Sequence, residues 1–139
     1  IYITNIVKCR PPGNRNPELE ERLACLPYLV EQINIIQPKI LLIMGLVAAQ
    51  TLLGNNNSLG WHREKIHYFM DIPVFVTYHP SALLRNSNWK RPAWIDVQEF
   101  EKEYRKILNE QTNFDAKFPD KPNIATSNAL TDSELPLSD

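Results

Sequence analysis

An uninterrupted apolar run, Ile40–Met44, strongly limits the folds open to this chain. Pro38 separates the run from the segment before it, and Gly45 turns the chain after it. A segment that is apolar at every position suits a strand that is covered on both faces. Ile72–Tyr78 has a similar character, and Ile1–Val7 is rich in β-branched residues with no breaker. The sequence therefore predicts three strands of a buried sheet.

Segments of helical periodicity separate these strands. Residues 17–37 repeat Leu, Val and Ile at helical spacing, and we expect Asn16 to cap this helix and Pro27 to kink it. Leu46–Leu53 predicts a short helix, and residues 92–108 predict a last amphipathic one. Strands that alternate with helices predict the α/β class, here a three-layer α/β/α fold with a central parallel sheet.

Length and charge divide the chain into two parts. The 139 residues suit one domain, which we expect at 1–110. Residues 111–139 are rich in Asn, Asp, Ser, Thr and Pro and are expected to form a disordered acidic tail. The tail carries a net charge of −3 against −1 for the whole chain, so residues 1–110 carry +2. A mildly basic body suits a nucleic-acid partner without requiring one.

The expected compartment is the cytoplasm. No apolar run approaches the roughly 20 residues that a membrane-spanning helix needs, and no basic-then-apolar leader is present. We expect a monomer by default. The two cysteines, Cys9 and Cys25, fit a disulfide, two buried thiols or metal ligands, and their spacing alone does not choose between these.

Polar side chains follow two of the predicted strands, Asn5 after the first and His79 after the last. Parallel strands bring such positions to one edge of the sheet, where α/β folds bind ligands. An Asn amide can pair with the edge of a planar polar ligand, and a neutral His can donate to an oxygen that gains negative charge. Strand-end Asn residues are also common turn formers, and a lone His before Pro is often a surface residue.

The loop after His79 combines features that suit DNA. Pro80 biases His79 to an extended conformation, and Ser81 can hold a phosphate. Leu83 and Leu84 are adjacent, so at least one should face solvent, where it could enter a base stack; alternatively both begin a packed helical turn. Positive charge for phosphates follows at Arg85, Lys90 and Arg91.

Three motifs, in the right order, resemble the iron–sulfur (family 4) uracil-DNA glycosylases. His79–Arg85 resembles the second signature motif of uracil-DNA glycosylases. Asn5 and the Cys9–Arg15 loop resemble the family 4 pattern around the uracil-reading asparagine and the third cluster cysteine, and Cys25 falls at the spacing of the fourth. Ile40–Gln50 also resembles the family.

This resemblance implies excision of uracil from DNA, by hydrolysis of the N-glycosidic bond of a flipped-out deoxyuridine. It implies that Asn5 reads the uracil edge and that His79 hydrogen-bonds the uracil O2 as negative charge accumulates there. Ser81 would pin a flanking phosphate, Leu83 would fill the gap left by the flipped base, and Arg85 would contact DNA. The expected partner is therefore uracil-containing DNA.

The same resemblance implies a 4Fe–4S cluster, with Cys9 and Cys25 as two of its four ligands. The family's first motif, which carries the acidic residue that positions water, and the first two cluster cysteines have no counterpart in residues 1–139. We expect them upstream of Ile1. We therefore expect this polypeptide by itself to be inactive and to hold no stable cluster, unlike its full-length parent.

Two other interpretations stay open. One is a noncatalytic iron–sulfur module of the same fold that binds nucleic acid, although a pure binder has no need of an oxyanion donor such as His79. The other is a generic α/β nucleotide-binding enzyme. The turn after Met44 contains only Gly45, and neither G-x-G-x-x-G nor G-x-x-x-x-G-K-[ST] is present, so the second interpretation has no phosphate-binding motif to support it.

Overall fold

The computed structural model describes residues 1–7, 13 and 17–117. It divides into two units, the first Ile1–Lys106 and the second beginning at Ile107. The first unit holds the sheet and the candidate site. In the described part of the second unit, the chain forms the C-terminal portion of the last helix.

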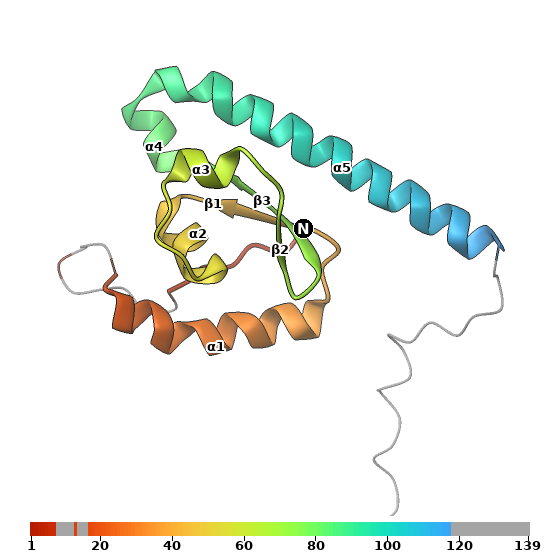
Figure 1. Ribbon diagram of the computed structural model, residues 1–139, viewed down its shortest axis with the longest axis horizontal. Helices are drawn as coiled ribbons and strands as arrows, with labels where there is room; N and C mark the ends of the chain where they lie inside the picture. Colours follow the sequence, from red (N-terminus) through yellow and green to blue (C-terminus); the bar gives the residue numbers. More distant parts are fainter. Residues whose placement is uncertain (8–12, 14–16, 118–139) are drawn as a thin grey trace, which may run out of the picture. The chain divides into compact units, whose positions relative to one another are not determined.

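The sheet of the first unit is small and mixed (Figure 1). Its strands are β1 (Leu41–Met44), β2 (His67–Phe69) and β3 (Ile72–Thr77), in the order β1-β3-β2. β1 and β3 are parallel, as predicted, with Met44 opposite Thr77. β2 is antiparallel to β3, so the expectation of a wholly parallel sheet is wrong at this edge. The short chain reversal between β2 and β3 permits only antiparallel pairing.

Helices precede, separate and follow the strands. They are α1 (Leu19–Ile36), α2 (Leu46–Leu53), α3 (Leu59–Arg63), α4 (Pro80–Arg85), the short 3₁₀ helix η2 (Ser87–Trp89) and α5 (Lys90–Lys117). Among the described residues, none of these helices combines the length and apolar character that a membrane crossing requires.

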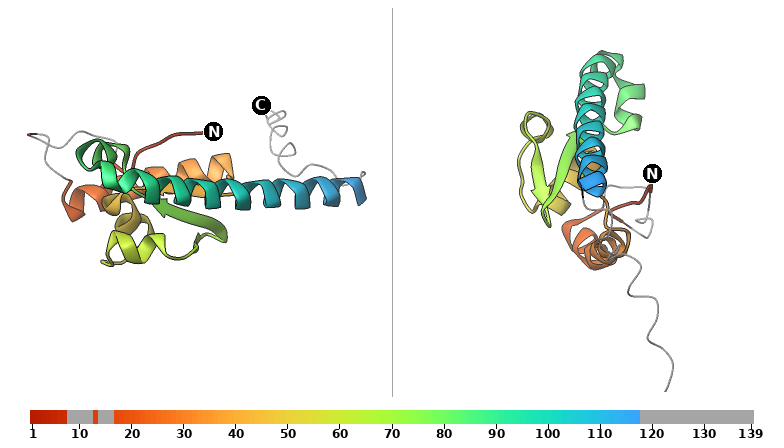
Figure 2. Two further views of the ribbon diagram at one scale, coloured as in Figure 1. Left: turned by 90° about the horizontal axis from the view of Figure 1, so that it is seen from above. Right: turned by 90° about the vertical axis from the view of Figure 1, so that its right-hand side faces the viewer.

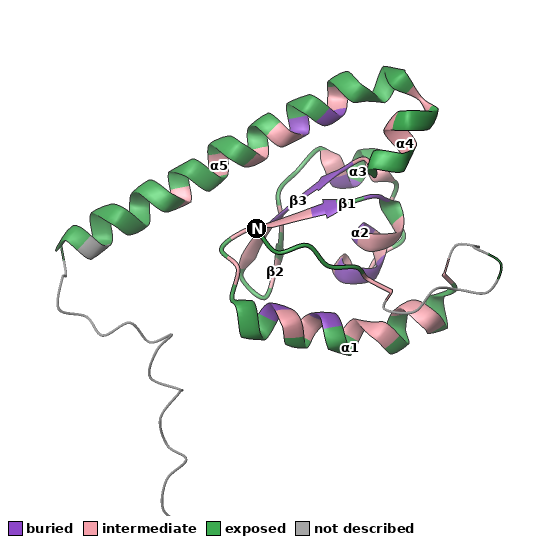
Figure 3. Ribbon diagram, turned by 180° about the vertical axis from the view of Figure 1, so that it is seen from behind, coloured by how far each residue is buried: buried purple, intermediate pink, exposed green. Residues whose placement is uncertain are grey.

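Two layers of helices enclose the sheet, with α1 on one side and the first part of α5 on the other (Figures 1 and 2). Successive side chains of β3 point to opposite faces of the sheet, so the strand contacts both helical layers. Val74 and Val76 join the buried cluster formed with α1 and α2, whereas Phe75 faces the ring of Phe100 on α5, with centroids 5.8 Å apart. The purple residues of Figure 3 accordingly concentrate on the strands and on the inward sides of the helices. The predicted α/β class is confirmed.

The start of α1 differs from the prediction. Its N-cap is Glu18 and not Asn16, which lies outside the described residues. Glu18 and Glu21 form a reciprocal capping box, in which the backbone N–H of Glu18 donates to the Glu21 carboxylate at 2.9 Å. This arrangement satisfies backbone donors of the first turn, so the helix begins at Leu19. Pro27 lies inside the helix, as predicted.

The segment Ile1–Val7 forms no strand, contrary to prediction. It is held to α1 by side chains instead: the Thr4 hydroxyl donates to the Gln32 amide oxygen at 2.9 Å, and the Gln32 amide donates to the Tyr2 hydroxyl at 3.4 Å. Ile6 packs against the core cluster. β-branched residues favour a strand only where a neighbouring strand pairs with them, and this segment has no such ladder.

α5 is longer than predicted. It continues past Leu108 to Lys117, so residues 111–117 are helical rather than part of a disordered tail. No Pro or Gly interrupts residues 93–117, which explains why the helix propagates. The rest of the predicted tail lies outside the described residues.

Candidate active site

His79 lies just beyond the carboxyl end of β3, where it caps the N-terminus of α4. Its backbone is extended, with φ −68° and ψ 141°, and Pro80 occupies the first turn of the helix. This is the conformation that the residue before a proline favours. The carbonyl oxygen of His79 accepts from the backbone N–H of Ala82 at 2.9 Å, which closes the turn.

The cap fixes which ring nitrogen of His79 carries the proton. Nδ1 accepts from the backbone N–H of Ser81 at 3.1 Å and lies 2.8 Å from the Ser81 hydroxyl oxygen. A backbone N–H can only donate, so Nδ1 presents a lone pair and the neutral ring carries its proton on Nε2. His79 is exposed, so this arrangement offers an Nε2–H donor at the surface of the sheet edge.

Gly45 lies against His79. Its φ of +97° belongs to a backbone region that is essentially restricted to glycine, and its N–H donates to the Thr77 carbonyl at 2.9 Å. A Cβ added to Gly45 would lie 3.2 Å from the Cβ of His79. The turn from β1 into α2 is therefore in close contact with His79, the second residue after β3.

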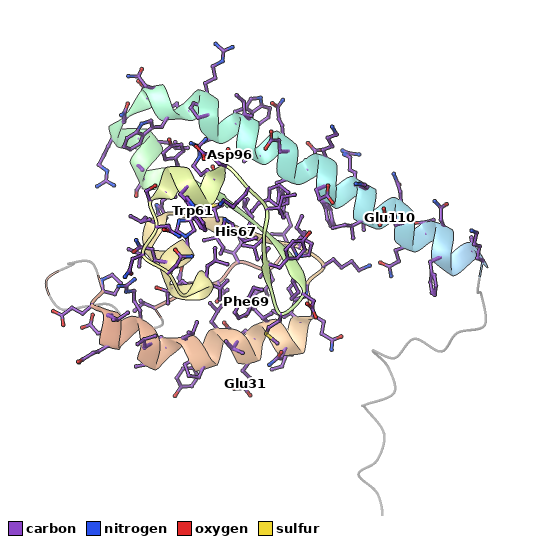
Figure 4. All side chains as sticks on the ribbon, in the orientation of Figure 1. Glu31, Trp61, His67, Phe69, Asp96 and Glu110 are labelled. Atoms are coloured by element: carbon purple, nitrogen blue, oxygen red, sulfur yellow. The ribbon has the colours of Figure 1, made fainter. Side chains whose placement is uncertain are left out.

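A polar network supports the end of β3. Arg63 of α3 makes a two-pronged ion pair with Asp96 of α5, with Nε–Oδ2 at 2.7 Å and Nη2–Oδ1 at 3.0 Å. Figure 4 labels Asp96 on α5. Asp96 also accepts from the Thr77 hydroxyl at 2.7 Å, and Arg63 donates to the Tyr78 hydroxyl at 3.1 Å. Burial lowers the pKa of Arg63, but the hydrogen bond and charge of Asp96 outweigh that effect and raise the pKa overall.

The sequence did not predict the network of Arg63, Asp96, Thr77 and Tyr78. Arg63 and Asp96 are 33 positions apart, in different helices, and no spacing rule connects them. The available signals were weak: an Asp at a position of α5 that falls among apolar, inward-facing residues, and a Thr at the end of a buried strand. Gly45 was predicted as a turn residue, but its contact with His79 depends on tertiary structure.

α4 presents its two leucines differently. Leu83 is half-buried, whereas Leu84 is 85% exposed, which confirms that at least one of the pair faces solvent. Leu83 lies one helical turn after His79, so the two share a face of the helix. The basic side chains that follow are exposed: Arg85, Lys90 and Arg91.

In the described part of the chain, the structure does not bring the other predicted site residues, Asn5 and Cys25, together with His79. Asn5 is exposed and does not end a strand, so the structure does not bring it to a strand edge shared with His79. Cys25 is a half-buried free thiol on α1, and Cys9 lies outside the described residues. Among the described residues no three His, Cys, Asp or Glu side chains gather to hold a metal ion. Those residues alone therefore do not fit a four-ligand cluster.

His79 caps a helix at the carboxyl edge of an α/β sheet, and this edge is where folds of the class bind their ligands. The model of the uracil DNA glycosylase superfamily matches residues 1–100. The chain belongs to this superfamily, and the resemblance noted in the sequence is confirmed.

Curated relatives agree. The Type-4 uracil-DNA glycosylase of Saccharolobus solfataricus is 46% identical over 94 residues, covering 62% of this chain and 44% of the relative. That of Sulfurisphaera tokodaii is 43% identical over 99 residues, covering 66% and 45%. A Type-5 uracil-DNA glycosylase of Pyrobaculum aerophilum is 33% identical over 90 residues, covering 63% and 39%. The chain spans about half the length of the curated relatives it matches.

Proposed function

We propose that the protein hydrolyses the N-glycosidic bond of deoxyuridine in DNA, which releases uracil and leaves an abasic site. One observation carries the proposal: the exposed ring of His79, whose Nδ1 accepts from Ser81 so that Nε2–H is the available donor. The names of the Type-4 relatives support the choice of uracil as the base.

In this proposal His79 acts on the leaving base. As the glycosidic bond breaks, the bonding electron pair stays with uracil, and negative charge accumulates on its O2 atom. The oxygen of a water molecule bonds to the sugar C1′, and the proton that this water loses balances the charge on the released uracil. A neutral Nε2–H donor placed against that oxygen would stabilise the transition state more than the ground state. Removing one such donor typically lowers the rate about 10²- to 10³-fold.

Asn5 is proposed to read the uracil edge. Its carbonyl would accept from N3–H and its NH₂ would donate to O4, whereas cytosine presents the reverse pattern. Asn5→Asp would remove the NH₂ donor and set a second acceptor against O4. We expect that variant to lose uracil release while retaining its affinity for DNA that lacks uracil.

The residues of α4 are proposed to contact the DNA around the flipped nucleotide. Ser81 would hold a flanking phosphate and Arg85 would neutralise another. Leu83, one turn from His79, would occupy the space that the flipped base vacates. The exposure of Ser81 and Arg85 and the position of Leu83 beside His79 are consistent with these roles.

A 4Fe–4S cluster is also proposed, with Cys9 and Cys25 as two ligands; the support is the cysteine spacing and the Type-4 name of the relatives. No step of the reaction above depends on it. Iron and sulfide content of the full-length protein, purified without oxygen, tests the assignment, with Cys25→Ser as the variant that should lose iron.

The direct test is release of free uracil from a uracil-containing duplex by the full-length protein, with a thymine-containing duplex as the control substrate. Uracil release with intact thymine DNA is the expected result. Tight binding to uracil-containing DNA without release of the base would instead support the noncatalytic nucleic-acid-binding module.

A further inference from the structure

We infer that the ion pair between Arg63 and Asp96 positions His79, and that it does so through Thr77 and Tyr78. These are the two residues that immediately precede His79, and each is held by a different member of the pair. The inference rests on the proposed function, because it assigns to Arg63 and Asp96 the task of placing a donor against the leaving base. Neither residue is proposed to touch the substrate.

Both carboxylate oxygens of Asp96 accept hydrogen bonds within this network. The residue is only 8% exposed; its Oδ2 accepts from both Arg63 and Thr77 at 2.7 Å, and its Oδ1 accepts from Arg63 at 3.0 Å. Buried ion pairs contribute little net stability over apolar residues of the same volume, because both charges lose their hydration. They do impose directional geometry. A pair that joins α3, α5 and the last residue of β3 is therefore better explained by placement than by stability.

Tyr78, the residue directly before His79, is held by Arg63. Its hydroxyl accepts from Arg63, whose guanidinium carbon lies 4.3 Å from the ring centroid. The ring also stacks on Trp89 of η2, with centroids 5.1 Å apart and planes 9° apart. Both the polar end and the flat surface of Tyr78 are thus fixed, which leaves the backbone leading into His79 little freedom.

The contacts of His79 itself cannot replace these constraints. The hydrogen bonds of its ring go to Ser81, two residues along the same turn, so they orient the ring relative to α4 only. The position of that turn relative to the sheet depends on the residues before it. The Arg63–Asp96 pair supplies that link from one side, and the Gly45 contact supplies it from the other.

Two variants test the inference in the full-length protein. Arg63→Lys keeps the positive charge but loses the planar fork that engages Asp96 and Tyr78 together. We expect kcat for uracil release to fall about 10- to 10²-fold, with KM close to that of the wild type, because misplacing a reacting group by about 1 Å costs on that scale. Tyr78→Phe keeps the ring stack and removes one hydrogen bond, and should lower kcat about 5-fold.

The matched control is Ile33→Ala, in the buried cluster between α1 and the sheet and outside the network. All proteins are assayed well below their melting temperatures. If Ile33→Ala lowers Tm as much as Arg63→Lys but keeps the wild-type kcat, the network acts on position and not merely on stability. A loss of kcat that follows Tm in all variants, or an Arg63→Lys protein with the wild-type kcat, overturns the inference.

Ring ¹⁵N spectra of His79 separate failure of the inference from failure of the proposed function. In the wild type we expect one set of resonances, with Nε2 protonated and Nδ1 unprotonated, assigned by the His79→Gln variant. Arg63→Lys should broaden or split that set, and Ile33→Ala should not. If the wild type releases no uracil, the proposed function fails, yet the spectra still decide: an unchanged His79 signal in Arg63→Lys overturns the positioning role.

Discussion

A Cβ on Gly45 would lie 3.2 Å from the Cβ of His79, so the turn after β1 and the cap of α4 are in contact across the carboxyl edge of the sheet. Gly45→Ala should therefore disturb the donor as well as the fold. The backbone at φ +97° costs a non-glycine residue on the order of 1–3 kcal/mol, and His79 must also move. We expect a lower Tm together with a loss of uracil release in single-turnover assays.

Gly54→Ala is the matched control for that variant. Gly54 also has a positive φ, +66°, but a Cβ there would meet nothing within 4 Å. It should lose stability, by about 1–2 kcal/mol, without losing activity at temperatures where it stays folded. Equal losses of activity in the two glycine variants would contradict the role given to the Gly45–His79 contact.

Ser81→Ala should weaken binding more than chemistry. The backbone N–H of Ser81 still donates to Nδ1 of His79, so the tautomer is preserved, whereas the hydroxyl proposed to hold a phosphate is gone. Loss of a contact made equally in ground and transition states raises KM with little change in kcat. Steady-state kinetics check this, and Ser87→Ala on the neighbouring η2 helix serves as the control. A large fall in kcat would mean that the hydroxyl is needed to orient His79.

Leu83→Ala should impair excision from duplex DNA more than from single strands. Only a duplex has a stack to refill after the base leaves it, and Leu83 lies on the same face of α4 as His79. Leu84→Ala, which alters the more exposed neighbour, should have the smaller effect on the ratio of the two rates. If Leu84→Ala changes the ratio more, Leu84 is the residue that enters the stack.

The capping box of α1 should matter for stability alone. Glu18→Ala removes the N-cap carboxylate and should cost about 0.5–2 kcal/mol in the free energy of unfolding. Glu31→Ala, at an exposed position of the same helix, should change that free energy by less than about 0.5 kcal/mol. Urea denaturation measures both. A cost for Glu31→Ala as large as that for Glu18→Ala would contradict the assignment of the cap.

The Arg63–Asp96 pair should be insensitive to pH in the range used for assays. A raised pKa in the folded state means that the stabilisation is fully present below the ordinary arginine pKa and is lost only as pH rises through the still higher folded value. The difference in unfolding free energy between wild type and Arg63→Met should therefore stay constant from roughly pH 7 to 9. A difference that shrinks with rising pH across this window would contradict a permanently charged Arg63.

The local parts of this structure could be predicted from sequence because local rules determine them. Ile40–Met44 has no polar position that could face water, and the helix from Leu46 to Leu53 lies between two glycines at its caps. The family assignment rested on residues close together in the chain, above all His79–Arg85, and the superfamily match confirms it.

The remaining features depend on partners distant in sequence. Ile1–Val7 has strand propensity but binds α1 through Thr4 and Tyr2. The antiparallel β2 is three residues long, too short for a period to be visible. Arg63 and Asp96 become a unit only when α3 and α5 meet over the end of β3.

The role of His79 is decided by single-turnover uracil release by wild type and His79→Gln, with His67→Gln on β2 as the control for loss of a histidine. With enzyme in excess over a uracil-containing duplex, we expect His79→Gln to slow base release about 10²- to 10³-fold while DNA affinity and the His67→Gln rate stay near wild type. A His79→Gln protein that releases uracil at the wild-type rate would mean that His79 does not stabilise the leaving base.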